Sequence, residues 1–108
     1  MTPDTMTFGH AIAAARKAMG LSQKELAALV IKDEDGGAIS PQYLNDIEHD
    51  RRSPTSDHLI RQFAVQLRID EGVLFLLAGK IPDDLRRQVT DPAKAAEAFM
   101  NFRRAITN

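Results

Sequence analysis

The sequence predicts an all-α fold, a bundle of short helices followed by a helical extension at the C-terminal end. Two observations support this class. Apolar residues recur at the three- and four-residue spacing of a helix in several segments, and residues that cap or end helices stand between those segments. With 108 residues, the chain is long enough for one modest core. We expect the helices of the bundle near residues 7–19, 22–31, 40–49, 56–67 and 71–78.

The first two expected helices have clear capping signals. Gly20 is placed to end the first helix, since glycine tolerates the left-handed conformation found there. Ser22 opens the second helix and Glu25 follows three residues later, which is the pattern of a capping box. The apolar stripe of the first helix comprises Phe8, Ile12, Ala15 and Met19. The buried side of the second is expected to comprise Leu26, Ala27, Leu29 and Val30.

The segment from residue 40 to residue 52 is the most informative part of the chain. Ser40 is a strong N-cap, and Pro41 suits the first helical position because the N–H that it lacks has no partner there anyway. Leu44 and Ile47 share one face of this helix and are expected to be buried. The outward side is then expected to carry Pro41, Gln42, Asn45 and Asp46.

The side chains on that outward side suit the edge of a base pair. Gln and Asn pair bidentately with adenine in a major groove, and a carboxylate such as Asp46 accepts from cytosine. Arg51 and Arg52 follow the helix, and paired guanidinium groups suit phosphate. The pattern is typical of a DNA recognition helix; the alternative is that these are ordinary solvated positions.

Together with the upstream sequence, this helix is similar to part of a known DNA-binding unit. The chain resembles the Cro/phage-repressor type of helix-turn-helix regulator, the XRE family, as far as about Gly79. The resemblance implies a lambda-repressor-like bundle of five helices that binds double-stranded DNA, with the helix starting at Ser40 in the major groove. It is carried by Arg16-Lys17-Ala18-Met19-Gly20-Leu21-Ser22-Gln23-Lys24-Glu25-Leu26-Ala27, by Ser40, Tyr43, Leu44, Ile47 and Glu48, by Pro54-Thr55-Ser56, and by Leu59, Phe63, Leu67 and Ile69.

The resemblance also implies residue roles. It pairs Arg16 with Glu48, which ties the first helix to the end of the third. His49-Asp50 departs from the family, because many relatives have glycine at this helix end. Base contacts are implied at Pro41, Gln42, Asn45 and Asp46. Phosphate contacts are implied at Gln23, Lys24, Ser40, Tyr43, Arg51 and Arg52.

The remaining helices of the bundle also carry start and stop residues. Thr55 is expected to cap the fourth helix, and Asp70 to open a fifth that Gly79 ends. A longer insert than the family's tight turn lies between the second and third helices, at residues 31–38. Its Asp-Gly-Gly tip predicts a short β-hairpin within residues 30–40, or else a solvated loop. The insert's acidic spacing does not fit a calcium-binding loop.

The C-terminal segment, residues 81–108, lies beyond the domain expected at residues 1–80, which begins with a flexible arm at 1–6. Asp91-Pro92 predicts a helix start, and Ala95, Phe99, Phe102 and Ile106 form one apolar face. Residues 73–78 are apolar on all sides, which is more than a five-helix bundle buries alone. The tail is expected either to fold back over that segment or to pair across a two-fold axis. Both alternatives rest on Val73, Phe75, Leu76, Phe99, Phe102 and Ile106.

The composition limits the partners. The net charge is −1, and residues 1–80 hold nine Lys and Arg against eleven Asp and Glu, so DNA affinity is expected to be modest and salt-sensitive. The chain has no cysteine, and no apolar run approaches the ~20 residues of a membrane span. A cytoplasmic location without cofactor or metal is expected.

An enzymatic function is not expected. The sequence lacks the phosphate-binding and nucleophile motifs, and its histidines are isolated from one another. The function expected is that of a DNA-binding transcriptional regulator acting as a homodimer. The alternative is a protein-binding adaptor or antitoxin-like regulatory partner that uses the same helical scaffold. RNA binding is disfavoured, because one Tyr and no Trp leave few aromatic platforms for stacking.

Overall fold

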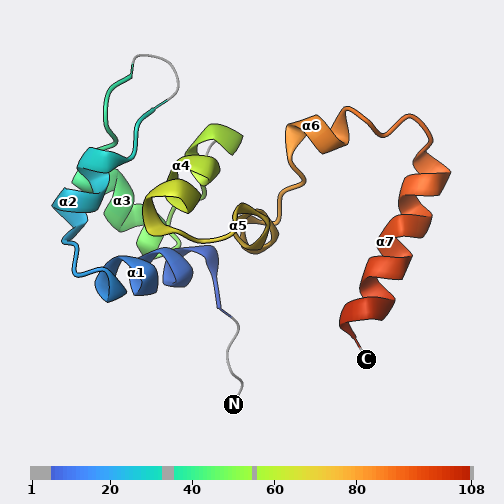
Figure 1. The fold of residues 1–108 in the computed structure, drawn as a ribbon, viewed down its shortest axis with the longest axis horizontal. Helices are drawn as coiled ribbons and strands as arrows, with labels where there is room; N and C mark the ends of the chain where they lie inside the picture. Colours follow the sequence, from blue (N-terminus) through green and yellow to red (C-terminus); the bar gives the residue numbers. More distant parts are fainter. Residues whose placement is uncertain (1–5, 33–35, 55, 108) are drawn as a thin grey trace.

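The computed structural model describes residues 6–32, 36–54 and 56–107. These residues form seven helices, and no extended strand occurs among them, so the all-α prediction is confirmed. In Figure 1 the helices of the N-terminal part are gathered together, and those of the C-terminal part extend away from them. In chain order the helices are α1 (Phe8–Ala18), α2 (Gln23–Leu29), α3 (Pro41–Glu48), α4 (Asp57–Leu67), α5 (Glu71–Ala78), α6 (Asp83–Arg86) and α7 (Pro92–Ile106).

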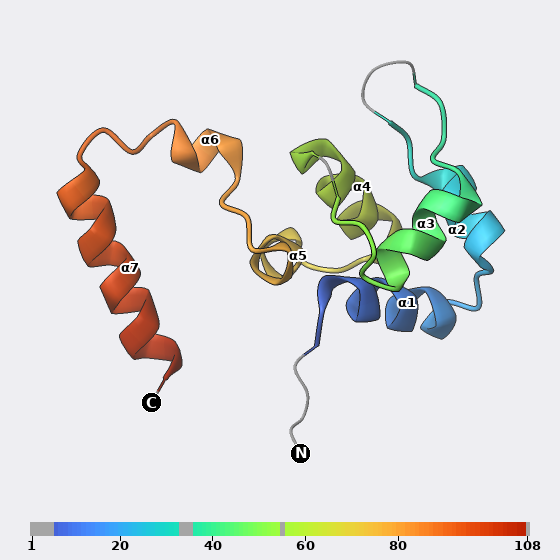
Figure 2. The ribbon, with the colours of Figure 1, turned by 180° about the vertical axis from the view of Figure 1, so that it is seen from behind.

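The core lies where α1 meets α3, α4 and α5, with α2 packed against α3 (Figures 1 and 2). Phe63 of α4 is fully buried and meets Phe8 of α1 edge to face, with ring centroids 6.1 Å apart. Leu29 was expected to be buried but is 43% exposed. The helix α2 ends at Leu29, and the next residue, Val30, is the one that packs into the core. The largest fully buried side chains are Phe63, Ile12, Leu26, Leu44, Ile47, Ile60, Leu74 and Val30.

The helix ends follow the predicted caps with one correction. Gly20 has φ +73° and follows α1 in a Schellman arrangement, in which the N–H of Leu21 donates to the carbonyl oxygen of Arg16. Ser22 and Glu25 form the capping box, and the backbone N–H of Ser22 holds the pKa of the Glu25 carboxyl below its usual value. The cap of α4 is Ser56, whose hydroxyl accepts from Leu59 N; Thr55 lies outside the described residues.

The insert between α2 and α3 begins and ends as an antiparallel pair. Ile31 bridges Ala38, and the N–H of Lys32 donates to Gly37 O at 2.8 Å. The base of the pair is anchored to α4, since Ile31 N donates to Gln62 Oε1 at 3.1 Å. This agrees with the hairpin alternative at its base, while the acidic residues 33–35 lie outside the described residues.

The C-terminal helices are not folded over the bundle. Both views show α7 standing apart from α1–α4, and none of its described residues is buried. Phe75 was expected to lie on a tail-packing or dimer surface, but it is 3% exposed and belongs to the core. Phe102 and Leu76 are 46% and 61% exposed. No helix among the described residues is long and apolar enough to cross a membrane.

A buried carboxylate links α4 to the segment that leads into α6. Asp57 Oδ1 lies 2.6 Å from Lys80 Nζ, and Asp57 Oδ2 accepts from the backbone N–H of Asp83 at 2.7 Å. The hydrogen bond from Lys80 is the main reason that the pKa of Asp57 lies below its usual value. This contact fixes where the chain leaves the bundle.

Candidate nucleic-acid interface

The two sides of α3 differ in burial as its sequence predicts. Leu44 and Ile47 are fully buried, and Ser40 caps the helix by accepting from Tyr43 N. Gln42 is exposed, and Asn45 is half-buried three residues further along the same side. The outward side of α3 therefore presents short polar groups on a helix that the core holds firmly. Of the residues expected to contact bases, Pro41 and Gln42 are exposed, and Asn45 and Asp46 are half-buried.

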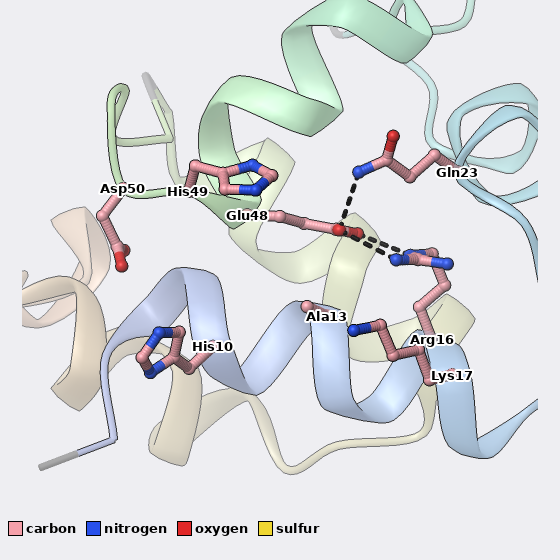
Figure 3. A pocket seen from close by; sticks show the side chains of 8 residues that line it. All are labelled: His10, Ala13, Arg16, Lys17, Gln23, Glu48, His49 and Asp50. Carbon is pink, nitrogen blue, oxygen red and sulfur yellow. Dashed lines mark hydrogen bonds and ion pairs between the residues drawn. The ribbon is translucent and has the colours of Figure 1, made fainter. Parts of the chain in front are cut away.

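The end of α3 is tied to α1 by an ion pair between Arg16 and Glu48. Arg16 Nε lies 2.7 Å from Glu48 Oε2, and Arg16 Nη2 lies 3.0 Å from Glu48 Oε1. The remaining guanidinium nitrogen, Nη1, donates to Leu21 O at 2.9 Å, at the turn between α1 and α2. The side chains are 11% and 3% exposed, so the pair is nearly dry. Arg16 thus joins α1, the turn that follows α1 and the end of α3, and Figure 3 shows its ion pair with Glu48.

Gln23, the first residue of α2, extends this network toward α3. Its amide nitrogen Nε2 donates to Glu48 Oε1 at 2.9 Å and to Asn45 Oδ1 at 3.1 Å. Gln23 was expected to contact phosphate, but both of its side-chain hydrogens are engaged within the protein. Its backbone N–H, in the first turn of α2, remains suited to an anion. Lys24 beside it is exposed.

Most of the other residues expected to contact DNA have local partners within the protein. Asp46 Oδ1 accepts from Gln42 Nε2 at 3.1 Å and from Arg51 Nε at 3.2 Å, so Arg51 is paired locally. The guanidinium carbon of Arg52 lies 5.4 Å from the centroid of the Tyr43 ring. The Tyr43 hydroxyl is buried and has no hydrogen-bond partner among the described residues. It is therefore not available to a phosphate, contrary to the expectation.

Asp50 is a structural residue that the sequence did not identify. It follows the C-cap of α3 with φ +59°, the left-handed conformation that glycine adopts most readily. Its carboxylate accepts from Thr7 Oγ1 at 2.7 Å and from Gly9 N at 3.0 Å, so it caps the start of α1. A β-carbon on Gly9 would lie 2.4 Å from Ile47 O, which explains the glycine. The departure from glycine was the signal that this turn has an additional role.

A cavity of about 330 Å³ lies beside the Arg16–Glu48 pair, between α1 and the end of α3 (Figure 3). Both cationic and anionic side chains line it, so its charge is mixed. Among the described residues no group of three metal-ligating side chains occurs, here or elsewhere. The cavity is lined by His10, Ala13, Arg16, Lys17, Gln23, Glu48, His49 and Asp50.

The fold and this site define a helix-turn-helix protein: α2 and α3 are packed together, and the polar side of α3 faces outward. Comparison with family models matches residues 12–64 to a family described as helix-turn-helix. This segment, from α1 into α4, is therefore a helix-turn-helix unit similar to that of the Cro/phage-repressor (XRE) type of DNA-binding transcriptional regulator. No curated protein and no solved structure matches the chain.

Proposed function

We propose that the protein binds operator DNA as a sequence-specific regulator, with α3 in the major groove. One observation carries this proposal: α3 is fixed on its inner side by Leu44, Ile47 and the Glu48 ion pair, while its polar side holds an exposed Gln42 and a half-buried Asn45. A rigid helix with short polar groups on its outer side is what direct readout of base edges requires.

Phosphate contacts on either side of that helix are expected from exposed cations and from one backbone group. Lys24 lies at the start of α2, where the N–H groups of the first turn favour an anion. Arg51 leaves its exposed ion pair with Asp46 to bind a phosphate, because an exposed ion pair contributes little stability. Ser40 and Arg52 complete the proposed set. Since the net charge is −1, affinity per subunit is modest and decreases with salt.

Two copies are proposed to act together on two half-sites about one DNA turn apart, or ~34 Å. The support is that Leu76 of α5 and the apolar face of α7 are exposed in one chain. A second copy covers both surfaces and adds the second recognition helix. The direction of regulation follows from where the operator lies relative to a promoter.

Selection of bound duplexes from a random DNA pool, at low and near-physiological salt, tests this function. The expected result is an enriched pseudo-palindrome whose half-sites are about one turn apart, with weaker binding at the higher salt. Enrichment of no sequence at either salt would contradict the proposal and favour the adaptor alternative. In that case the exposed apolar residues of α6 and α7 become the first surface to test for a protein partner.

A further inference from the structure

We infer that Asn45 contacts its base pair only as a hydrogen-bond donor, and that Gln23 imposes this orientation and so a preference for guanine over adenine. The inference rests on the proposed function, because it requires α3 to lie in a major groove. It differs from the pairing with adenine that asparagine alone predicts, in which the amide both donates and accepts.

The orientation of the Asn45 amide depends first on Glu48. Its carboxylate holds two hydrogen bonds from Arg16 and is 3% exposed, so it is an acceptor in a fixed position. Rotation of Glu48 would leave a guanidinium group without its partner in a nearly dry site. The carboxylate therefore determines the orientation of any amide that contacts it.

Gln23 transmits that constraint. The atom of its amide that faces Glu48 Oε1 at 2.9 Å must be the nitrogen, because a carbonyl oxygen there would meet a carboxylate oxygen. The nitrogen has two hydrogens, and the same atom lies 3.1 Å from the Asn45 side chain. Since the second hydrogen is donated there, the Asn45 atom that receives it must be the oxygen, Oδ1.

The amide group of Asn45 thereby turns its oxygen toward Gln23 and its nitrogen away from Gln23. Its oxygen accepts from Gln23 on the inner side, and its amide nitrogen has no hydrogen-bond partner among the described residues. In a major groove guanine presents two acceptors, O6 and N7, whereas adenine presents one acceptor and one donor. An amide whose nitrogen faces the groove can donate its N–H groups to both guanine acceptors. At adenine it leaves the N6 donor without its partner.

The outward Gln42 is not constrained in the same way. Its amide nitrogen donates to Asp46, but this bond is exposed and water competes for both groups. Both Gln23 hydrogen bonds are partly buried, and one of them ends at Glu48 of the buried ion pair. The fixed orientation is therefore specific to Asn45.

The test uses the enriched operator and competition between duplexes that differ at one base pair. Asn45→Ala identifies the base pair that Asn45 contacts, because this substitution abolishes the discrimination between bases at that pair and at no other. For the unmodified protein, guanine is expected at that position, with binding roughly fivefold or more tighter than adenine. Gln23→Ala releases the amide and is expected to reduce this guanine-to-adenine ratio at that base pair alone. Gln88→Ala, the same substitution at an exposed residue after α6, should leave the ratio unchanged.

A second measurement on the unmodified, DNA-free protein keeps the test independent of the stability of any variant. By NMR, the side-chain amide hydrogens of Gln23 are expected to exchange slowly with water, and those of Asn45 rapidly. Slow exchange at Asn45 with rapid exchange at Gln23 would overturn the inference. So would adenine at the Asn45 base pair, or a guanine preference that survives Gln23→Ala, and both results leave the proposed function standing. A pool in which no duplex is enriched overturns the proposed function together with the inference.

Discussion

Arg16 and Glu48 are 32 residues apart in the sequence, yet they form an ion pair with two hydrogen bonds of 2.7 and 3.0 Å. The pair connects α1 to the last residue of the proposed recognition helix. Both side chains are almost fully buried, so each depends on the other for a partner of opposite charge. The position of α3 on the bundle is therefore coupled to α1.

Removing one member of that pair is expected to destabilise the protein substantially. Glu48→Gln leaves the Arg16 guanidinium buried without a counter-charge, which is expected to lower the free energy of unfolding by roughly 2–4 kcal/mol. Chemical denaturation measures this loss. The double variant Arg16→Met with Glu48→Gln should lose less than the sum of the two single losses. A loss below about 0.5 kcal/mol for Glu48→Gln would show an ordinary surface contact instead.

Gly9 is expected to be intolerant of any side chain. A β-carbon there would lie 2.4 Å from Ile47 O and 2.6 Å from Asp50 Oδ1, and the backbone oxygen cannot move without displacing the end of α3. Gly9→Ala is therefore expected to cost about 1–3 kcal/mol of unfolding free energy, despite the better helix propensity of alanine. Gly72→Ala in α5 is the matched control. The nearest atom to its β-carbon is a side-chain oxygen of Asp70 at 3.1 Å, so its cost should be much smaller. Equal melting temperatures for the two variants would contradict the close approach of α1 and α3.

The Asp57–Lys80 pair predicts loss of stability in acid. The folded pKa of Asp57 lies below its unfolded value of about 3.9, so the carboxylate contributes stability above that pH. This contribution is lost as the pH falls from about 4 through the folded pKa. Lys80→Gln removes the main cause of the lowered pKa and should reduce the part of the acid-induced loss that depends on Asp57. Lys94→Gln in the exposed first turn of α7 is the control. Identical pH profiles of unfolding free energy for wild type and Lys80→Gln would contradict this assignment.

The apolar face of α7 predicts self-association. Phe99 and Phe102 are 52% and 46% exposed in the single chain, so Phe99→Ser with Phe102→Ser is expected to convert a dimer to a monomer without unfolding the bundle. Sedimentation equilibrium at micromolar concentration measures the mass. Val65→Ser, at a position on α4 that is 69% exposed, is the control and should remain dimeric. A monomeric mass for the unmodified protein would remove the dimer proposal.

Local signals in the sequence predicted most of the fold. Ser22, Ser40 and Asp91 all cap helices where expected, because an N-cap hydrogen bond reaches only three residues along the chain. The spacing of Leu44 and Ile47 predicted the buried side of α3 for a similar reason. Five of the helices begin and end within two residues of the expected positions.

Features that depend on contacts between distant segments were not predictable from local pattern. Gln23 was expected to contact a phosphate from the start of a helix, yet its side-chain partners are 22 and 25 residues away. Tyr43 appeared able to reach a phosphate, but packing buries its hydroxyl. Phe75 was expected to lie outside the core, because residues 73–78 are all apolar and their pattern does not indicate which side of the helix is buried. Only the packing of α5 on α4 and α1 selects which side is buried.

The double variant Gln42→Ala with Asn45→Ala shows whether α3 reads base pairs. Dissociation constants are measured for the selected operator and for a scrambled duplex of the same length, with Gln88→Ala as control and circular dichroism to monitor the fold. The structure predicts that the double variant keeps its helical signal and its weak binding to both duplexes, while the ratio of the two constants falls toward one. A ratio equal to that of the unmodified protein would contradict base readout by α3.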